Sequence, residues 1–142
     1  MKKTFKKNEI KEVAKEIIEK LSPSTSATIV ALTGDLGAGK TTLTQTIARE
    51  LGIKENVISP TFFIMKSYQL KDSAYDRLVH IDAYRLDSHQ ELEKLGWAEL
   101  IADPKNLILI EWPERVAEII PRSAYRISLE HINEDERGIE SF

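Results

Sequence analysis

The segment Gly34–Thr41, with the sequence GDLGAGKT, constrains the fold of this 142-residue chain more than any other feature. It matches the pattern G-x-x-x-x-G-K-[ST] in full. The apolar, β-branched run Thr28–Thr33 precedes it, and such a run is typical of a strand buried on both faces of a parallel sheet. Apolar residues at helical spacing follow from Leu43 to Leu51, and then Gly52, which suits a left-handed helix cap. A plain Gly-rich turn is the alternative, but these flanks favour a phosphate-binding loop between a strand and a helix.

The rest of the chain alternates strand-like and helix-like patterns. We predict a helix that Asn8 caps and that runs to Leu21. Strands are expected at Val57–Leu70 (after a turn at 59–60), Arg77–Tyr84, Asn106–Ile110 and a final one at Ala124–Ile132, and short helices at Gln90–Leu95, Trp97–Ala102 and Pro113–Ile120. The short link Lys71–Tyr75 predicts that the strands on either side of it pair antiparallel. The predicted fold class is therefore α/β: a three-layer P-loop NTPase fold with a largely parallel sheet and an antiparallel strand pair, as a single domain over residues 1–142.

The composition excludes several kinds of site and partner. The absence of cysteine rules out disulfides, thiolate zinc sites and a cysteine nucleophile. No apolar run exceeds four residues, whereas a membrane span needs roughly 20, so we expect no membrane association and a cytoplasmic location. A net charge of −3 argues against a dedicated duplex-binding protein.

The two ends of the chain differ in charge. Residues 1–20 contain seven Lys and four Glu, whereas residues 130–142 contain five acidic residues and one Arg. Solvated surface is one reading of both ends, and docking surfaces for a partner are the other.

The phosphate-binding loop has a defined chemical task for each part. Backbone N–H groups along the loop are expected to point at phosphate oxygens, and the helix that follows adds the positive end of its dipole. Lys40 would supply a charge to the β- and γ-phosphates, and the Thr41 hydroxyl would ligate Mg²⁺. The expected nucleotide-binding residues here are Leu36, Gly37, Ala38, Gly39, Lys40, Thr41 and Thr42.

A site of this kind also needs an acidic residue at the end of a neighbouring strand, to hold Mg²⁺ and to orient the attacking water. Glu111 follows the apolar run Leu107–Ile110. Asp82 is a second candidate at another strand end, that of the predicted strand Arg77–Tyr84. A charged residue that leaves a strand at the surface is the alternative for each, and it is the stronger alternative for Asp82, because Asp commonly ends strands. If both face the phosphates, one holds the metal and the other orients water, and the sequence does not divide these roles.

Several other residues are candidates with a plain structural alternative. Ser59, Pro60 and Thr61 resemble a switch in which the threonine senses the γ-phosphate or the metal, although a simple turn fits as well. His80 has no second His or Cys at ligand spacing, so we interpret it as a hydrogen-bonding residue of the site and not as a metal ligand.

Two aromatic and two basic residues complete the candidate site. Tyr84 and Trp112 are either packing residues or part of the site. Arg85 and Arg115 are candidates to stabilise phosphate charge, with solvated surface as the alternative.

The nucleotide and the reaction follow partly from what the sequence lacks. The guanine-specific pattern [NT]-K-x-D does not occur, and the GTPase pattern D-x-x-G is absent after the candidate switch and occurs only near the end of the chain, at 135–138, which favours ATP. The chain has no convincing insertion for an acceptor pocket or an Arg-bearing lid, which favours hydrolysis over phosphate transfer. A small P-loop kinase of a metabolite and an ATP-dependent binding module remain the alternatives.

Five motifs occur in an order that is similar to one family. The P-loop, VISPTF at 57–62, HIDAYR at 80–85, Glu91 with Leu95-Gly96, and IEWP at 110–113 together resemble the TsaE (YjeE) family of bacterial P-loop ATPases over about residues 28–120. That family acts in forming N6-threonylcarbamoyladenosine in tRNA with the TsaB–TsaD pair, after a TsaC-type enzyme has made threonylcarbamoyl-adenylate. The resemblance implies an ATPase whose hydrolysis gates docking on TsaB–TsaD, slow alone and stimulated by those partners.

The resemblance also implies a role for particular residues. Lys40 becomes the phosphate lysine, Thr41 the Mg²⁺ ligand and Glu111 the second acid on the metal side. Asp82 becomes a catalytic or γ-phosphate-sensing acid, and Trp112 a functional aromatic beside the nucleotide. The family often has a Thr early in the first helix, where this chain has residues 8–11 without one, so the contacts to adenine near residues 4–11 are left open.

Overall fold

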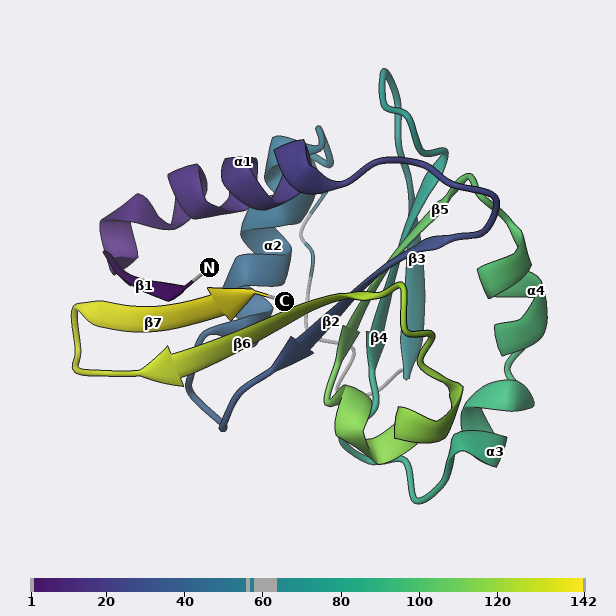
Figure 1. Ribbon diagram of the computed structural model, residues 1–142. Helices are drawn as coiled ribbons and strands as arrows, with labels where there is room; N and C mark the ends of the chain where they lie inside the picture. The colour runs from purple at the N-terminus through teal and green to yellow at the C-terminus, as the bar shows by residue number, and fades with distance from the viewer. Residues whose placement is uncertain (1, 56, 58–63, 142) are drawn as a thin grey trace.

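The computed structural model describes residues 2–55, 57 and 64–141, which form one seven-stranded sheet with helices on both faces (Figure 1). The strands are β1 (Lys2–Lys6), β2 (Thr28–Thr33), β3 (Met65–Gln69), β4 (Arg77–Asp82), β5 (Asn106–Glu111), β6 (Tyr125–His131) and β7 (Glu136–Ser141). The helices are η1 (Lys7–Glu9), α1 (Ile10–Lys20), α2 (Lys40–Glu50), α3 (His89–Glu93), α4 (Trp97–Ala102) and η2 (Pro113–Ile119).

The sheet is parallel at its centre and antiparallel at its two edges. The strand order is β1-β7-β6-β2-β5-β4-β3, and β2 pairs parallel with both β5 and β6 while β4 pairs parallel with β5. The pairs β3–β4, β6–β7 and β1–β7 are antiparallel. The predicted parallel sheet and the predicted antiparallel pair next to the link Lys71–Tyr75 are therefore confirmed.

Successive side chains of the central strands point to opposite faces of the sheet and so belong to two separate apolar cores. Leu78 of β4 and Leu109 of β5 face the layer of α1 and α2, whereas Val79 and Ile108 face the layer that contains α3, α4 and η2. β2 and β5 are buried along almost their whole length because helices cover both of their faces. The expected three-layer architecture is confirmed.

The two strands at one side of the sheet differ from the sequence prediction. β1 and β7 were not expected, and β6 is not the final strand. Asn8 lies inside η1, and α1 begins at Ile10 after Glu9, so the predicted cap is wrong; the Glu9 carboxylate instead accepts a hydrogen bond from the backbone N–H of Lys6 at 2.7 Å. β1 buries only Phe5, so its local pattern carries almost no strand signal.

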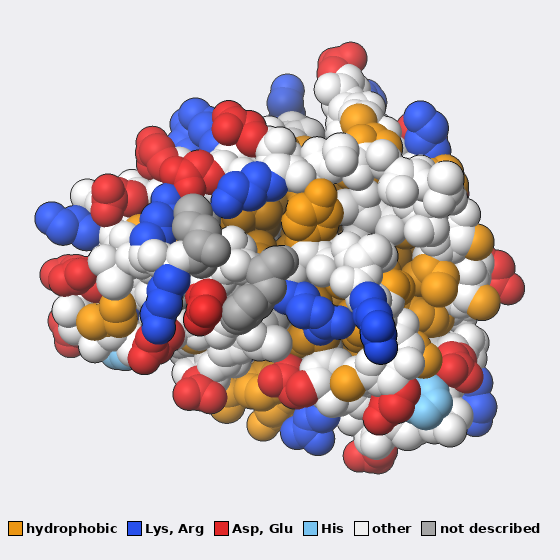
Figure 2. All heavy atoms as spheres, viewed as in Figure 1, with side chains coloured by type: hydrophobic (Ala, Val, Ile, Leu, Met, Phe, Trp, Pro, Cys, Tyr) orange, Lys and Arg blue, Asp and Glu red, His pale blue; other side chains and the backbone are white. Residues whose placement is uncertain are grey.

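The pairing of β1 with β7 brings the two oppositely charged ends of the chain together. Lys2 lies opposite Glu140, and Lys6 lies opposite Glu136. Lys3 forms a 2.6 Å ion pair with Glu16 of α1. Basic and acidic side chains are correspondingly interspersed over this side of the molecule in Figure 2. The ends therefore form one edge of mixed charge and not two separate surfaces of opposite sign.

The helices are short. α1 and α2 each contain 11 residues. Within the described part of the chain, no helix has the length and apolar content that crossing a bilayer requires.

Candidate functional site

The loop between β2 and α2 turns sharply because its glycines adopt backbone angles that other residues avoid. Gly34 has a φ of 149°, and an added Cβ would lie 2.7 Å from the carbonyl oxygen of Leu129 in β6. Gly39, with a φ of 101°, precedes the first residue of α2 in a left-handed conformation. The loop thus leaves β2 close against β6 and starts the helix at Lys40.

This close approach gives a stability prediction. Gly34→Ala should lower the free energy of unfolding by at least about 2 kcal/mol, because it adds both backbone strain and a steric clash with a backbone oxygen. The control is Gly52→Ala, where φ is 94° but the space around an added Cβ is open. Thermal unfolding followed by circular dichroism should show a clearly larger fall in Tm for Gly34→Ala. Equal falls for the two variants would show that the contact with Leu129 is not limiting.

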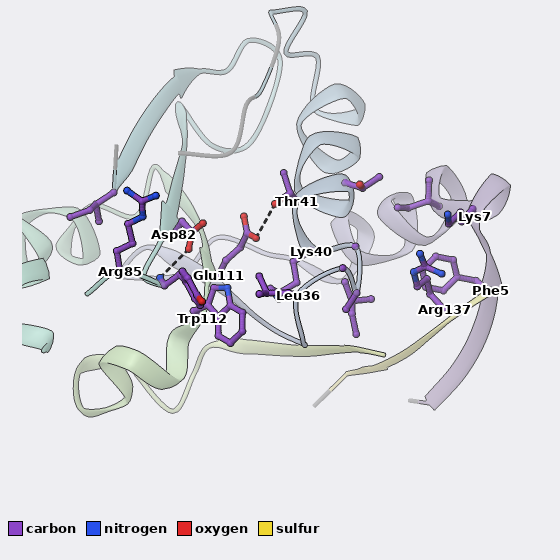
Figure 3. A pocket seen from close by; sticks show the side chains of 18 residues that line it. Phe5, Lys7, Leu36, Lys40, Thr41, Asp82, Arg85, Glu111, Trp112 and Arg137 are labelled. Carbon is purple, nitrogen blue, oxygen red and sulfur yellow. Dashed lines mark hydrogen bonds between the residues drawn. The ribbon is translucent and has the colours of Figure 1, made fainter. Parts of the chain in front are cut away.

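A cavity of about 950 Å³ opens beside this loop (Figure 3). Its wall includes the loop, the ends of β4 and β5 with the residues that follow them, and part of the segment from β1 to α1 together with β7. The sequence-predicted site residues that line it are Leu36, Gly37, Ala38, Gly39, Lys40, Thr41, Thr42, Asp82, Tyr84, Arg85, Glu111 and Trp112.

Glu111 is the centre of the polar contacts in the site. It ends β5, where the sheet register places it beside Leu32 of β2 and Asp82 of β4, and only 2% of it is exposed. The Thr41 hydroxyl donates a hydrogen bond to Glu111 Oε1 at 3.2 Å, and His80 Nε2 lies 2.6 Å from Glu111 Oε2. Both oxygens of this carboxylate are therefore engaged, one toward the start of α2 and one toward β4.

Asp82 lies next to Glu111 across the β4–β5 pair. Its Oδ1 accepts a hydrogen bond from the backbone N–H of Tyr84 at 3.0 Å. Burial raises the pKa of the Asp82 carboxyl; the bond from Tyr84 opposes this effect, the charge of Glu111 adds to it, and His80 and Lys40 oppose it. The net direction is upward, so Asp82 takes up a proton at a less acidic pH than an exposed aspartate does.

Lys40 is held over its own loop. Its ammonium donates hydrogen bonds to the carbonyl oxygens of Gly34 and Asp35, and it lies 4.3 Å from the centre of the Trp112 ring. Burial lowers the pKa of the Lys40 ammonium, and the nearby carboxylates, of which Glu111 has the largest effect, partly restore it. The side chain is thus a desolvated cation at the cavity wall, which is the environment in which a charge attracts an anion most strongly.

An aromatic pair extends from Lys40 along the cavity. Trp112 has a φ of 58° and a ψ of 48°, an uncommon left-handed conformation for a bulky residue. Its ring centre lies 5.0 Å from that of Tyr84, and the guanidinium carbon of Arg115 lies 5.5 Å from the Tyr84 ring. Arg85 lines the cavity, whereas Arg115 reaches the site through Tyr84 and is not one of the described residues that line it.

Comparison with known proteins agrees with this geometry. A family model described as "Threonylcarbamoyl adenosine biosynthesis protein TsaE" matches residues 4–139. The chain belongs to the TsaE family. It is 37% identical over 125 residues to the tRNA threonylcarbamoyladenosine biosynthesis protein TsaE of Haemophilus influenzae, which covers 88% of this chain and 75% of that protein. It is 39% identical over 111 residues to the protein of the same name from Bacillus subtilis, covering 78% of this chain and 66% of that one.

A solved structure shows the same fold. The crystal structure of Bacillus subtilis YdiB aligns with a TM-score of 0.73 and 30% sequence identity, covering 98% of this chain and 83% of that one. The resemblance inferred from the five motifs is therefore confirmed at the level of the family and the fold.

The TsaE-family match extends to the part of the site that sequence reasoning did not identify. Phe5, Lys7, Ile10, Leu129 and Arg137 also line the cavity. Phe5 lies opposite Arg137 in the β1–β7 pair, so these two reach the cavity only because the ends of the chain meet. The open question about residues 4–11 pointed to this region, but nothing in the sequence indicated Arg137.

The remaining prediction for the site concerns 59–61. Ser59, Pro60 and Thr61 lie outside the described residues, so the switch stays a prediction. Ile64, three residues further along the chain, lines the cavity.

The oxygen atoms of Thr41 and Glu111 suit a hard divalent cation. Mg²⁺ prefers oxygen ligands and is commonly held by one or two protein groups together with substrate phosphates and water. Within residues 2–55, 57 and 64–141, no group of three or more His, Cys, Asp or Glu side chains could hold a metal unaided. The donor set therefore fits a cation that enters with a phosphate ligand better than a structural metal.

Proposed function

We propose that this chain binds ATP with Mg²⁺, hydrolyses it, and acts in the biosynthesis of N6-threonylcarbamoyladenosine in tRNA. The observation that carries the proposal is the contact between Thr41 and Glu111, which joins the phosphate-binding loop to the acidic strand end inside one cavity. The names of the TsaE relatives supply the pathway.

The loop and Lys40 would bind the phosphates. α2 starts at Lys40, so its first backbone N–H groups and its dipole face the cavity that the loop lines. Lys40 would exchange its bonds to the carbonyls of Gly34 and Asp35 for the β- and γ-phosphate oxygens. This exchange loses little, because a charge-assisted bond to phosphate is stronger than a bond to a neutral carbonyl.

The two acids would divide the remaining work. Glu111, hydrogen-bonded to Thr41, would belong with Thr41 on the metal side, and Mg²⁺ when bound would supply positive charge that stabilises the phosphates. Asp82 lies beside it with a raised pKa, which suits a carboxylate that orients water and accepts its proton. Trp112 and Tyr84 would border the bound nucleotide, and Arg85 would add positive charge near the phosphates.

In the pathway, the chain would act in the cytoplasm on other proteins. The partners we propose are TsaB- and TsaD-type proteins, with a functional link to a TsaC-type enzyme and to tRNA. Hydrolysis would gate docking on the TsaB–TsaD complex and reset it between turnovers. The mixed charge of the β1–β7 edge gives no continuous basic surface there for tRNA, which favours protein partners.

The test combines hydrolysis with docking. ATP hydrolysis by the isolated chain should be slow and should become faster when TsaB and TsaD homologues are added. Capture of these two proteins by this chain in a pull-down should depend on ATP. Cells lacking the chain should lose the modified adenosine. A hydrolysis rate that the partners do not change, together with an unchanged level of the modified adenosine in tRNA, would refute the proposal. Stoichiometric phosphate transfer to a metabolite would identify a kinase instead.

Tryptophan fluorescence gives a direct prediction about nucleotide binding. Trp112 lies beside Lys40 and lines the cavity, whereas Trp97 is 3% exposed in an apolar core and is not among the described residues that line the cavity. Nucleotide should change the emission of a Trp97→Phe variant, which retains Trp112, and leave that of a Trp112→Phe variant almost constant. A response carried by Trp97 alone would contradict the placement of the nucleotide.

A further inference from the structure

We infer that His80 is the positioning residue of Glu111: it holds one carboxylate oxygen so that the other faces Thr41 and the Mg²⁺ position. The inference rests on the proposed function, because it assigns His80 a task in metal-assisted nucleotide binding. It concerns a side chain that lines no part of the cavity wall in the described chain, and that therefore has no direct contact to offer a ligand.

The geometry links three elements in one line. Thr41 at the start of α2 contacts Glu111 Oε1, and Glu111 Oε2 lies 2.6 Å from His80 Nε2 in β4. Because a carboxylate oxygen accepts, Nε2 donates its hydrogen in this bond. The distance is at the short end for a bond of this type, as expected for a charge-assisted contact. Rotation of the carboxylate would break this bond and the Thr41 bond together.

The surroundings of His80 make a purely stabilising role a poor explanation. His80 is 0% exposed, and its neighbours in the sheet include Leu78, two residues earlier, Leu109, directly opposite in β5, and Lys66, directly opposite in β3. Burying a polar pair there costs desolvation free energy that an apolar side chain of similar size would avoid. The pair is therefore better explained by what it does to Glu111.

The other ring nitrogen supports this reading. Nδ1 of His80 is buried and has no hydrogen-bond partner among the described residues. If the imidazole only stabilised the core, we would expect both of its nitrogens to have hydrogen-bond partners. Among the described residues, the hydrogen bond of the ring is with Glu111, and the ring lies on the sheet face that Leu78 and Leu109 share.

The experiment uses two pairs of variants. His80→Gln keeps an amide donor at the position of Nε2, whereas the amide of His80→Asn is too short to reach Glu111. His80→Leu removes the donor at similar volume, and Val79→Ala is the matched control, since Val79 is equally buried in the same strand but faces the opposite core. Folding of each variant is checked by thermal unfolding without nucleotide or metal.

The readout is the gain in ADP affinity that Mg²⁺ produces, measured by calorimetry with and without the metal. Removing a group that orients a metal ligand typically costs about 10- to 100-fold in metal affinity. His80→Asn and His80→Leu should therefore reduce the Mg²⁺-dependent gain by roughly tenfold or more, with metal-free ADP affinity nearly unchanged. His80→Gln should recover most of the gain. In hydrolysis, kcat should fall more than KM rises.

The possible outcomes separate the two claims. An unchanged Mg²⁺-dependent gain in His80→Asn and His80→Leu would overturn the role of His80 and leave the proposed function intact. The same loss in Val79→Ala would assign the effect to lost stability. If the unaltered chain showed no Mg²⁺-dependent gain at all, the proposed function would fail, and the role of His80 with it.

Discussion

Lys40→Ala should lower the affinity for ATP by roughly 30- to 160-fold, or about 2–3 kcal/mol, the size expected for losing a hydrogen-bonded charge. The ammonium lies at the cavity wall. The other lysine among the described lining residues, Lys7, lies toward β1 and away from Lys40 (Figure 3). Calorimetric titration with ATP and Mg²⁺ measures the change. The folded state should persist, because the carbonyl oxygens that Lys40 contacts lie beside the open cavity, where water can replace the ammonium.

The matched control for Lys40→Ala is Lys54→Ala. Lys54 is exposed and follows the end of α2 that lies away from the loop. Its substitution by alanine therefore removes the same charge from the chain without changing a contact of the loop. Its affinity for ATP should equal that of the unaltered chain. If Lys40→Ala also binds ATP as tightly as the unaltered chain, the placement of the phosphates at the loop is contradicted. If both variants lose affinity to the same extent, the loss reflects net charge.

Glu111→Ala should reduce the rate of ATP hydrolysis by at least about 100-fold, which is the usual cost of removing a preorganised charged group from a reaction centre. Metal-free nucleotide affinity should change little, because the phosphates are bound by the loop and by Lys40. The variant also leaves His80 buried without its acceptor, at a cost of about 1–3 kcal/mol in stability. Hydrolysis is followed by phosphate release, and stability by thermal unfolding.

Two companion variants interpret that result. Glu111→Gln keeps the shape but removes the charge. Its amide oxygen can still accept from His80, and its amide N–H can donate to the Thr41 hydroxyl, so it should lose hydrolysis with a smaller loss of stability. Glu12→Ala, on the exposed face of α1, is the control for removing an acidic residue. Retained hydrolysis in Glu111→Ala would move the catalytic role to Asp82. Lost hydrolysis with retained tRNA modification would instead indicate an ATP-dependent binding module.

Much of the fold was predictable because its central elements carry strong local signals. The runs that became β2 and β5 are apolar and β-branched, and helices cover them on both faces, so the pattern that predicts a buried strand also describes its environment. The loop Gly34–Thr41 has its own sequence pattern because the backbone conformations of its glycines restrict the residue type. The edge that β1 forms carried no such signal. β1 buries one residue of five, and its strand conformation depends on pairing with β7.

The candidate site divides in the same way. The sequence alone identified the phosphate-binding loop, Lys40, Thr41, and the acids Asp82 and Glu111 as candidates. The loop follows a recognisable strand, and each acid ends one. Only the tertiary structure decided that Glu111 contacts Thr41 and His80, and that Phe5 and Arg137 complete the cavity from opposite ends of the chain. The physical reason is sequence distance: residue type and spacing determine local conformation, whereas the pairing of strands that are far apart in the sequence decides which distant side chains meet.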